Sequence, residues 1–450
     1  MALSPQAAQR ALIAFQRFGL GAKPGGPGRI GGDPKAAVRD EVKTAGIAKI
    51  NNSALPSYAK ACFESQMGYA RAEAVRRAEL AARVDKHMSV EIGFVERLVV
   101  FWANHFSMTV NKTGAVRGTI GQWERDVVRA NVLGRFADML HGTIAHPAMI
   151  AYLDNVESIG PNSPSGQQQG VGFNENLARE LLELHTLGSG GGYSEKDVIA
   201  FAKILTGWSY VRGWESDGGY NGGTSANRGR FIYRDNWHEP GPIAFMGRTY
   251  AAGKRQAQRV LDDLAEHPAT AEHIAFKLVR HFITDEPTPE MVKPLKRTFL
   301  RTGGNLRAVA LALIDLPEAW SAPLTKLRTP YEMLIAQYRA LGTRFADDKP
   351  WVLSVPLNAL HQMQWESPSP EGYSDDTPKW LNPDAMRIRP DVAQWTNWVT
   401  VGSYQSDVVP LAKSLYGAAL SRATRERVNA IGNKNNALTI LFSSPEFQRR

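Results

Sequence analysis

Residues 174–187 read NENLARELLELHTL, and the order of polar and apolar residues in this stretch is typical of an amphipathic helix. Asn174 is a suitable N-cap, because its short side chain can accept a hydrogen bond from the first turn. With about 100° between successive residues, the polar residues on one face are Asn176, Arg179, Glu180 and Glu183. The leucines that lie roughly 80–140° away are Leu177, Leu181 and Leu184. This stretch therefore predicts a helix with one polar and one apolar side.

Helical patterns dominate the rest of the chain as well. Asp33 and Pro34 open a helix as N-cap and first-turn residue, and residues 194–197 form a capping box. Strand signals are sparse, and the best are residues 230–234 and 243–250. The sequence therefore predicts an all-α fold, a predominantly helical bundle or stack with at most a small β-hairpin. The further helices that we expect are 7–20, 58–86, 89–106, 116–140, 254–265, 268–283, 288–302, 305–314, 330–341, 384–400, 407–420, 422–431 and 435–448.

Three stretches rich in glycine, proline and short polar residues interrupt this pattern. They are expected as irregular loops at about 160–172, 211–230 and 365–380. The first two flank the helix at 174–187. Long loops inside a compact domain are either functional lids or tolerated insertions, and the sequence leaves both alternatives open.

The composition excludes several classes of protein. The chain has 450 residues, of which 43% are hydrophobic and 22% charged, so global disorder is excluded. Cys62 is the single cysteine, which excludes a disulfide scaffold and cysteine-based zinc or iron–sulfur sites. The sequence contains no run of about 18 uncharged apolar residues, so it predicts no transmembrane helix. We therefore expect a soluble globular protein.

The formal charge of +9 permits an anionic partner without identifying one. The arginines are dispersed, and no zinc-finger spacing or aromatic RNA-binding strand accompanies them, which disfavours nucleic acid. Arginines and glutamines interrupt residues 7–17, so this stretch does not read as a signal peptide. We expect a cytoplasmic protein, with export in complex with a signal-bearing partner as the alternative.

Glu180 and Glu183 are the first candidate catalytic residues. They lie one helical turn apart, so each raises the proton affinity of the other if both are desolvated. Such a pair can divide the roles of general acid and general base. Asn174, Asn176 and Arg179 are the candidate substrate-binding residues beside them. The alternative is a solvated polar face on which Arg179 pairs with a glutamate.

His105 is the next candidate catalytic residue, on the same aromatic face as Trp102. It is either a core histidine bonded to a backbone carbonyl, or a proton shuttle or metal ligand opposite Glu180 or Glu183. No H-E-x-x-H motif and no pair of histidines four residues apart occurs, so a zincin site is excluded. A metal site would have to form through tertiary contacts, and the sequence identifies no metal or cofactor.

His238 is the last candidate catalytic residue. It follows the second glycine-rich loop in the turn Trp237-His238-Glu239-Pro240-Gly241. There it would either contact a substrate or stabilise the turn through its own hydrogen bonds. Trp237 and Trp208, with Trp102, are further candidates for substrate binding.

The motif at 174–188 belongs to a longer pattern that resembles a known bacterial family. Other parts of this pattern are residues 17–22, 101–102 with 105–106, 146–149 with 152–154, 192–194, 205–208, His238 with Gly241, and 444–450. In these residues the chain is similar to the bacterial family of proteins of unknown function DUF1800. The resemblance spans nearly the whole chain and implies one family-length helical domain over residues 1–450. Family members commonly have His-Asp where this chain has His238-Glu239.

The resemblance implies no reaction, but it implies a partner. Members of the family are often encoded beside a second protein that resembles the phosphatase–sulfatase superfamily and carries a twin-arginine export signal. Two functions follow as hypotheses. One is an enzyme of hydrolase or lyase type that acts on a polar or anionic polymer, such as a polysaccharide, in a cleft lined by the four candidate catalytic residues. The other is a non-catalytic binding or assembly partner of the co-encoded exported protein.

Overall fold

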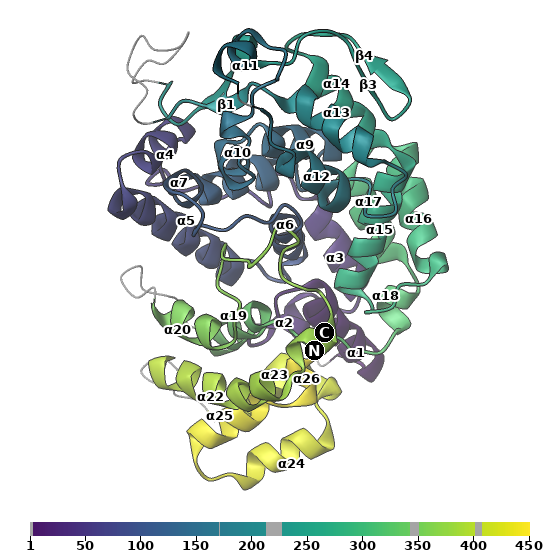
Figure 1. Cartoon of the computed structure of the whole chain (residues 1–450). Helices are drawn as coiled ribbons and strands as arrows, with labels where there is room; N and C mark the ends of the chain where they lie inside the picture. Colours follow the sequence, from purple (N-terminus) through teal and green to yellow (C-terminus); the bar gives the residue numbers. More distant parts are fainter. Residues whose placement is uncertain (1–2, 171, 213–226, 343–350, 401–406) are drawn as a thin grey trace.

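The computed structural model describes residues 3–170, 172–212, 227–342, 351–400 and 407–450. Helices make up most of these residues, and the strands among them form two small antiparallel pairs (Figure 1). The predicted all-α fold is therefore confirmed. Within the described ranges, no helix is both long enough and apolar enough to cross a lipid bilayer.

The first part of the chain forms a series of helices, in which η marks a 3-10 or π helix. In chain order they are α1 (Pro5–Ile13), η1 (Ala14–Phe18), α2 (Gly26–Arg29), α3 (Pro34–Lys43), α4 (Tyr58–Ser65), α5 (Tyr69–Ser89), α6 (Phe94–His105), α7 (Gly114–Trp123), η2 (Glu124–Val128), α8 (Arg129–Asn131), α9 (Phe136–Ile144) and α10 (Pro147–Tyr152).

The middle part contains the strands. Its elements are η3 (Asn155–Glu157), α11 (Pro164–Gln169), α12 (Asn176–Glu180), η4 (Leu181–His185), α13 (Glu195–Leu205), β1 (Trp208–Tyr210), β2 (Phe231–Tyr233), η6 (Asp235–Trp237), β3 (Ile243–Phe245), β4 (Arg248–Tyr250), α14 (Gln256–Glu266), α15 (Pro268–Phe282), α16 (Pro289–Arg301), α17 (Leu306–Asp315) and α18 (Glu318–Ser321). The last part consists of α19 (Pro330–Leu341), α20 (Trp351–Ala359), α21 (Thr377–Trp380), α22 (Pro383–Thr400), α23 (Val408–Tyr416), η7 (Gly417–Ala419), α24 (Arg422–Ala430), α25 (Lys434–Phe442) and α26 (Pro445–Gln448).

Local capping chemistry explains where several helices begin. The Asp33 side chain accepts a hydrogen bond from the backbone of Ala36 at the start of α3, and Pro34 occupies its first position. Ser194 and Asp197 form the predicted capping box of α13, each side chain accepting from the backbone of the other. These starts were predictable because a cap depends only on neighbouring residues.

The two strand pairs lie near the predicted strands. β1 pairs with β2, with Trp208 opposite Tyr233, and β3 pairs with β4, with Ile243 opposite Tyr250. No strand was expected at β1, which follows the end of α13 almost directly. There are consequently two small strand pairs among the described residues, one more than the single hairpin that we expected.

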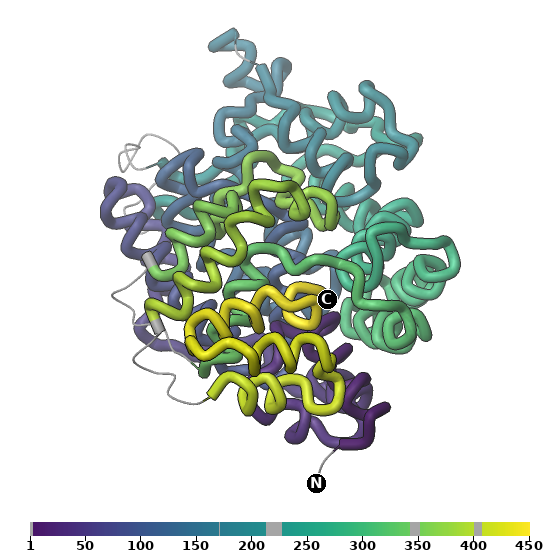
Figure 2. The backbone as a smooth tube through the Cα atoms, turned by 90° about the horizontal axis from the view of Figure 1, so that it is seen from below, coloured from purple at the N-terminus to yellow at the C-terminus, as the bar shows by residue number. Residues whose placement is uncertain are grey.

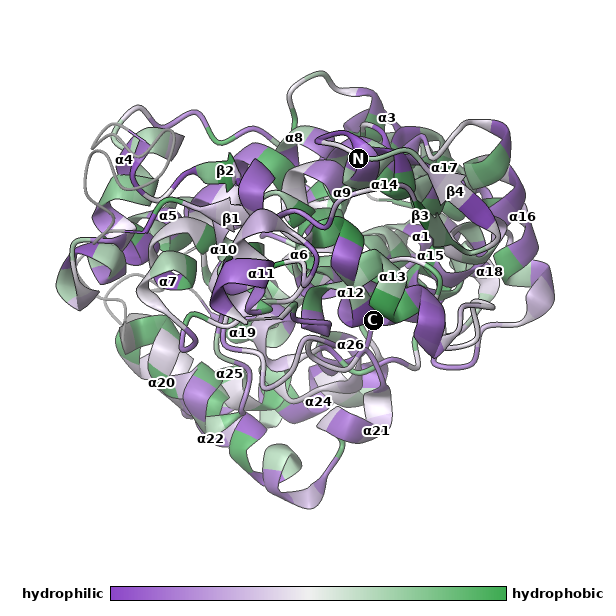
Figure 3. Cartoon of the chain, turned by 45° about the horizontal axis from the view of Figure 1, so that its top comes forward, coloured by the Kyte–Doolittle hydropathy of each residue, from purple (hydrophilic) through white to green (hydrophobic). Residues whose placement is uncertain are grey.

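Some expected boundaries differ from the structure. The helix expected at 58–86 is divided into α4 and α5 at Gly68, whose φ of 103° lies in a region that glycine tolerates. The loop expected at 160–172 contains the short helix α11, because Ser163 caps it and Pro164 fits its first turn. In Figure 3 this helix is mainly hydrophilic, as its run of glutamines requires. The loop at 365–380 is irregular up to α21, and most of the loop at 211–230 lies outside the described residues.

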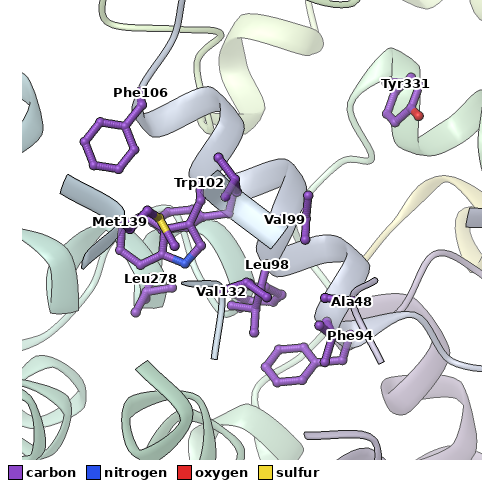
Figure 4. Packing of buried hydrophobic residues seen from close by; sticks show 14 of the residues in the cluster. Ala48, Phe94, Leu98, Val99, Trp102, Phe106, Val132, Met139, Leu278 and Tyr331 are labelled. Carbon is purple, nitrogen blue, oxygen red and sulfur yellow. The ribbon is translucent and has the colours of Figure 1, made fainter. Parts of the chain in front are cut away.

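The core is built around α6. Phe94, Leu98 and Trp102 lie on successive turns of this helix and are almost completely buried (Figure 4). The Trp102 ring lies 5.7 Å from the Phe136 ring of α9, centroid to centroid. The two ends of the chain also pack together, since α1 contacts both α23 and η7 (Figure 2). Segments far apart in the sequence therefore share one hydrophobic core.

Candidate functional site

The helix predicted at 174–187 is present, in two parts of different geometry. α12 is a regular α-helix, and η4, which follows it directly, is a π-helix. The Asn174 side chain accepts a hydrogen bond from the backbone of Asn176 at 2.8 Å, in agreement with its expected capping role. Single-turn π segments within helices are rare and frequently occur at functional sites.

The two sides of this helix have the predicted character. Leu177, Leu181 and Leu182 are completely buried against the core. Glu180 and Glu183 are half-buried on the other side. We call the surface formed by these two glutamates the acid face.

The only arginine of the motif is engaged away from the acid face. Arg179 forms ion pairs with Glu175 at 2.9 Å and with Glu195, the first residue of α13, at 2.6 Å. Within the part of the chain that the structure describes, neither Glu180 nor Glu183 has a hydrogen bond or an ion pair through its side chain. Arg179 therefore holds α12 against α13, and it leaves the carboxylates of the acid face without an ion-pair partner.

The electrostatics of the acid face favour a protonated carboxyl group. Burial raises the pKa of Glu180, and the negative charge of Glu183 raises it further, while Arg179 opposes both effects more weakly. Burial and the charge of Glu180 raise the pKa of Tyr152 to about 12. Burial and the charge of Glu183 also raise the pKa of Tyr193. Two neutral phenol groups therefore accompany the two carboxyl groups.

The tyrosines were not among the predicted site residues. Tyr193 stands in the stretch 192–194 that resembles the family, but its proximity to Glu183 depends on how the chain turns after η4. Tyr152 ends α10, and no local pattern connects it with Glu180. Only the folded structure could identify these two phenols.

His105 lies behind the same helix rather than beside the acid face. Its side chain is 1% exposed, and its Nε2 lies 3.1 Å from the backbone carbonyl of His185. The His105 ring also lies near the rings of His185 and His273, with centroids 5.9 and 6.2 Å apart. Burial, together with the positive charge of Lys277, holds the pKa of His105 far below its usual value. These contacts match the alternative of a core histidine bonded to a carbonyl.

His238 is also buried, and both of its ring nitrogens have a hydrogen-bond partner. Its Nδ1 lies 3.0 Å from the carbonyl oxygen of Thr206, and its Nε2 lies 3.1 Å from Oε1 of Gln256. The Glu239 carboxylate accepts hydrogen bonds from the backbone and the side chain of Asn162. The turn at 237–241 thus joins the end of α13 to the start of α14 and to the loop before α11.

The remaining predicted residues divide between surface and core. Asn176 is exposed beside the acid face, whereas Trp102, Trp208 and Trp237 are all buried. The Trp237 ring stacks on the Arg234 guanidinium at 4.6 Å. Asn174, Asn176 and Arg179 thus lie on or next to the helix that carries Glu180 and Glu183, with Arg179 paired to Glu175 and Glu195, and the histidines and tryptophans lie in the interior. The described residues contain no group of three or more His, Cys, Asp or Glu side chains arranged to hold a metal ion.

A second polar region is buried. It consists of two networks of ionisable side chains, and both networks contribute residues to the lining of a cavity of about 60 Å³. The first ion network comprises Arg83, His87, Glu96, Glu124 and Arg129. The second ion network comprises Arg97, His281, Glu332, Asp375 and Arg450. We call the cavity that they line the central cavity.

The central cavity is formed by segments that are distant in the sequence. Its walls come from α5, α6, the start of α19 and the irregular segment 362–375. The sequence predicts these three helices and the irregular loop at 365–380, but nothing in it indicates that they meet around a cavity. Apart from Glu124 and Arg129, which are five residues apart in the consecutive elements η2 and α8, the paired residues belong to separate elements or to irregular segments, so no local spacing marks them.

The geometry thus defines an all-α protein with a carboxylate pair at an α–π helix junction. The model of one protein family, described as "Protein of unknown function (DUF1800)", matches residues 13–449 of this chain. The chain therefore belongs to this family, and the resemblance noted in the sequence is confirmed. No curated protein and no solved structure matches the chain.

Proposed function

We propose that the chain is an enzyme that cleaves a polar or anionic polymer by general acid–base catalysis, with Glu180 and Glu183 as the catalytic residues. One observation carries this proposal: both carboxyl groups are half-buried, one turn apart and without an ion pair among the described residues. Partial burial removes some of the water that would otherwise stabilise a carboxylate charge, and no protein group replaces it here. The family motif provides an arginine for this purpose, yet Arg179 pairs with two other glutamates.

The two carboxyl groups have different roles in this proposal. The raised pKa of Glu180 keeps a proton available for a leaving group, so Glu180 acts as the general acid. Glu183 is the general base, which activates water in a hydrolase or removes a proton in a lyase. The neutral phenols of Tyr152 and Tyr193 add hydrogen-bond donors beside the reacting groups.

A polymer is the substrate class that suits this position. Both glutamates are partly accessible at the surface, so an extended chain can reach them without entering a closed pocket. The net charge of +9 attracts an anionic polymer to the protein and increases the rate of encounter. The two histidines are not needed in this mechanism, because both are buried: Nε2 of His105 lies against the His185 carbonyl, and both ring nitrogens of His238 lie against interior oxygen atoms.

The test is a pair of isosteric substitutions, Glu180→Gln and Glu183→Gln, assayed on a panel of neutral and anionic polysaccharides. Release of reducing ends reports hydrolysis, and ultraviolet absorption of an unsaturated uronic acid reports lyase activity. Each substitution should lower kcat by about 10²–10⁴-fold, the usual contribution of a general acid or base. The free energy of unfolding should change by less than about 0.5 kcal/mol, because no partner is lost.

Glu195→Gln is the matched control, since Glu195 is an exposed glutamate on the same surface that pairs with Arg179. It should retain most of the activity. Equal loss of activity in all three variants, or activity retained in Glu180→Gln, would contradict the assignment of the acid face as the catalytic site.

The second candidate function is that of an assembly partner for the co-encoded exported protein, which would also carry this chain to the periplasm. The observation that favours it is a group of exposed apolar side chains on and around α20 and α22. Its members are Val355, Leu381, Met386 and Trp398, of which Trp398 is 67% exposed. Co-expression with the partner is the test: Trp398→Ser should abolish co-purification, and activity without any complex would exclude assembly as the main function.

A further inference from the structure

A cleft of about 550 Å³ lies at the C-terminal ends of α5 and α19. Besides these two helix ends, its walls come from the segment 49–52 and from Lys23. None of its lining residues borders the central cavity or belongs to α12 and η4, which carry the acid face. Its volume falls within the range of ordinary small-molecule sites, about 300–1,000 Å³.

Four cationic side chains line this cleft. They are Lys23, Lys49, Lys86 and Arg339. Among the described residues, none of the four forms an ion pair with a carboxylate. Asp85 is the only acidic residue in the described lining, so positive charge is in clear excess there. We call this space the basic cleft.

Arg339 is completely buried, and backbone carbonyls rather than carboxylates hold it in place. Its guanidinium group donates to the carbonyl oxygens of Gly21 at 2.9 Å, Val90 at 2.9 Å and Glu91 at 2.6 Å. Burial lowers the pKa of Arg339 to about 10, so the group is still protonated at neutral pH. The hydrogen bonds fix the guanidinium but leave its charge without a counter-ion in contact.

The carboxylates that act on Arg339 from a distance have partners of their own. Glu91 pairs with Arg29 at 2.9 Å, and Glu41 accepts hydrogen bonds from backbone N–H groups at the start of α6. The pKa of Lys23 is lowered by burial and then by the positive charge of Arg339. The cations of the basic cleft therefore repel one another, and an anion between them would relieve this repulsion.

Helix capping uses only part of this positive charge. Nζ of Lys23 donates to the carbonyl oxygen of Ser89, the last residue of α5, at 2.9 Å. A helix C-terminus carries roughly half a negative charge, so the ends of α5 and α19 together offset about one cation. Lys49, which lies outside both helices, and Lys86 have no hydrogen bond or ion pair through their side chains among the described residues. Capping therefore does not account for the whole cluster.

Two short amide side chains complete the recognition groups. Asn51 and Asn52 line the cleft, and in the described part of the chain neither amide nitrogen has a hydrogen-bond partner. No aromatic side chain occurs in the described lining, so the cleft offers no ring on which a nucleobase could stack.

From this set we propose that the basic cleft binds the phosphate ester of a small polyhydroxy compound, such as a sugar phosphate. The ammonium groups of Lys23, Lys49 and Lys86 bind the phosphate as point charges. The amides of Asn51 and Asn52 bind hydroxyl groups, because an amide both donates and accepts hydrogen bonds. Arg339 contributes its charge from below the surface without contacting the ligand.

The experiment is calorimetric titration of the full chain with glucose 6-phosphate, ribose 5-phosphate and glycerol 3-phosphate, at constant ionic strength set by sodium chloride. We expect saturable one-site binding of at least one of these esters. The uncharged parents glucose, ribose and glycerol should not bind, because the lysines have no phosphate to hold. Inorganic phosphate should bind at least about tenfold more weakly than the best ester, because it makes no hydroxyl contacts.

Lys49→Gln and Lys86→Gln should each weaken ester binding by about tenfold, because a charged hydrogen-bond donor is lost. Both variants should fold, since neither side chain has a partner to lose among the described residues. Lys43→Gln is the matched control, because Lys43 is an exposed lysine that pairs with Asp40 outside the cleft. It should bind the ester like the wild type.

Glu180→Gln should also leave ester binding unchanged, which separates this site from the proposed catalysis. Three results would overturn the proposal. They are absence of saturable binding of all three esters by the wild type, inorganic phosphate binding as tightly as the best ester, and equal binding by the wild type, Lys49→Gln and Lys86→Gln.

Discussion

The carboxylates of the two ion networks and those of the acid face occupy opposite electrostatic environments in the same molecule. Glu96, in the first ion network, is 1% exposed, accepts two hydrogen bonds from Arg129 at 2.8 and 2.9 Å, and lies 3.2 Å from His87. The positive charge of Arg129 and the nearby His87 ring outweigh the effect of burial and lower the pKa of Glu96 to about 2. Glu180 is less buried but has no such partner, and its pKa is raised. In this pair of carboxylates, the presence of a cationic partner, rather than the depth of burial, accounts for the opposite directions of the two pKa shifts.

Stability measurements should show the largest difference between these regions. Glu96→Gln removes the anion that compensates buried Arg129 and should lower the free energy of unfolding by about 3–5 kcal/mol. Glu180→Gln should change it by less than about 0.5 kcal/mol. Urea unfolding of both variants at pH 7 measures the difference. Similar losses of unfolding free energy in the two variants would mean that Glu180 has a structural partner. The distinction between the first ion network and the acid face would then be wrong.

The contributions of Glu96 and Glu180 to the free energy of unfolding should change with pH in opposite directions. The pKa of Glu96 is lowered, so its contribution is fully present above about pH 4.5 and is lost as the pH falls toward about 2. The pKa of Glu180 is raised, so its contribution is present below about pH 4.5 and is lost as the pH rises through its higher value. Each group changes the unfolding free energy by at most about 1.4 kcal/mol per pH unit.

Buried histidines should make the folded chain lose stability at a higher pH than the carboxylates alone would. Burial lowers the pKa of His87 and of His281 to about 4, so both stay neutral in the folded chain when they would be protonated in the unfolded chain. Their contribution is fully present above about pH 6.5 and is lost as the pH falls toward about 4. Thermal unfolding of the wild type between pH 7 and pH 4 should therefore show a falling Tm, and a constant Tm would contradict the neutral assignment.

Local features of the fold could be predicted from the sequence. Caps such as Asp33 and Ser194, and the two sides of the helix at 174–187, depend on residues that are neighbours along the chain. The pairing of Glu180 with Glu183 follows from helical spacing for the same reason. The change from α to π geometry at Leu181 could not be predicted, because both helices accept the same order of leucines and glutamates.

Features that depend on tertiary contact could not be predicted. His105 was expected either in the core or opposite the glutamates, and only its contact with the His185 carbonyl decides between these positions. Arg83 and Glu124 belong to different helices about 40 residues apart, so no motif marks their contact. The central cavity was missed for this reason, although one of its walls is the irregular segment that was noticed at 365–380.

The most direct test of the central claim is the pKa of the Glu180 carboxyl group, measured by carbon-13 NMR titration of glutamate-labelled protein. Its resonance is assigned as the signal that is missing in Glu180→Gln. The account predicts a pKa above 4.5 that falls toward this value in Glu183→Gln, because the neighbouring negative charge is removed. A pKa at or below 4.5 in the wild type, or one that does not respond to Glu183→Gln, would contradict it.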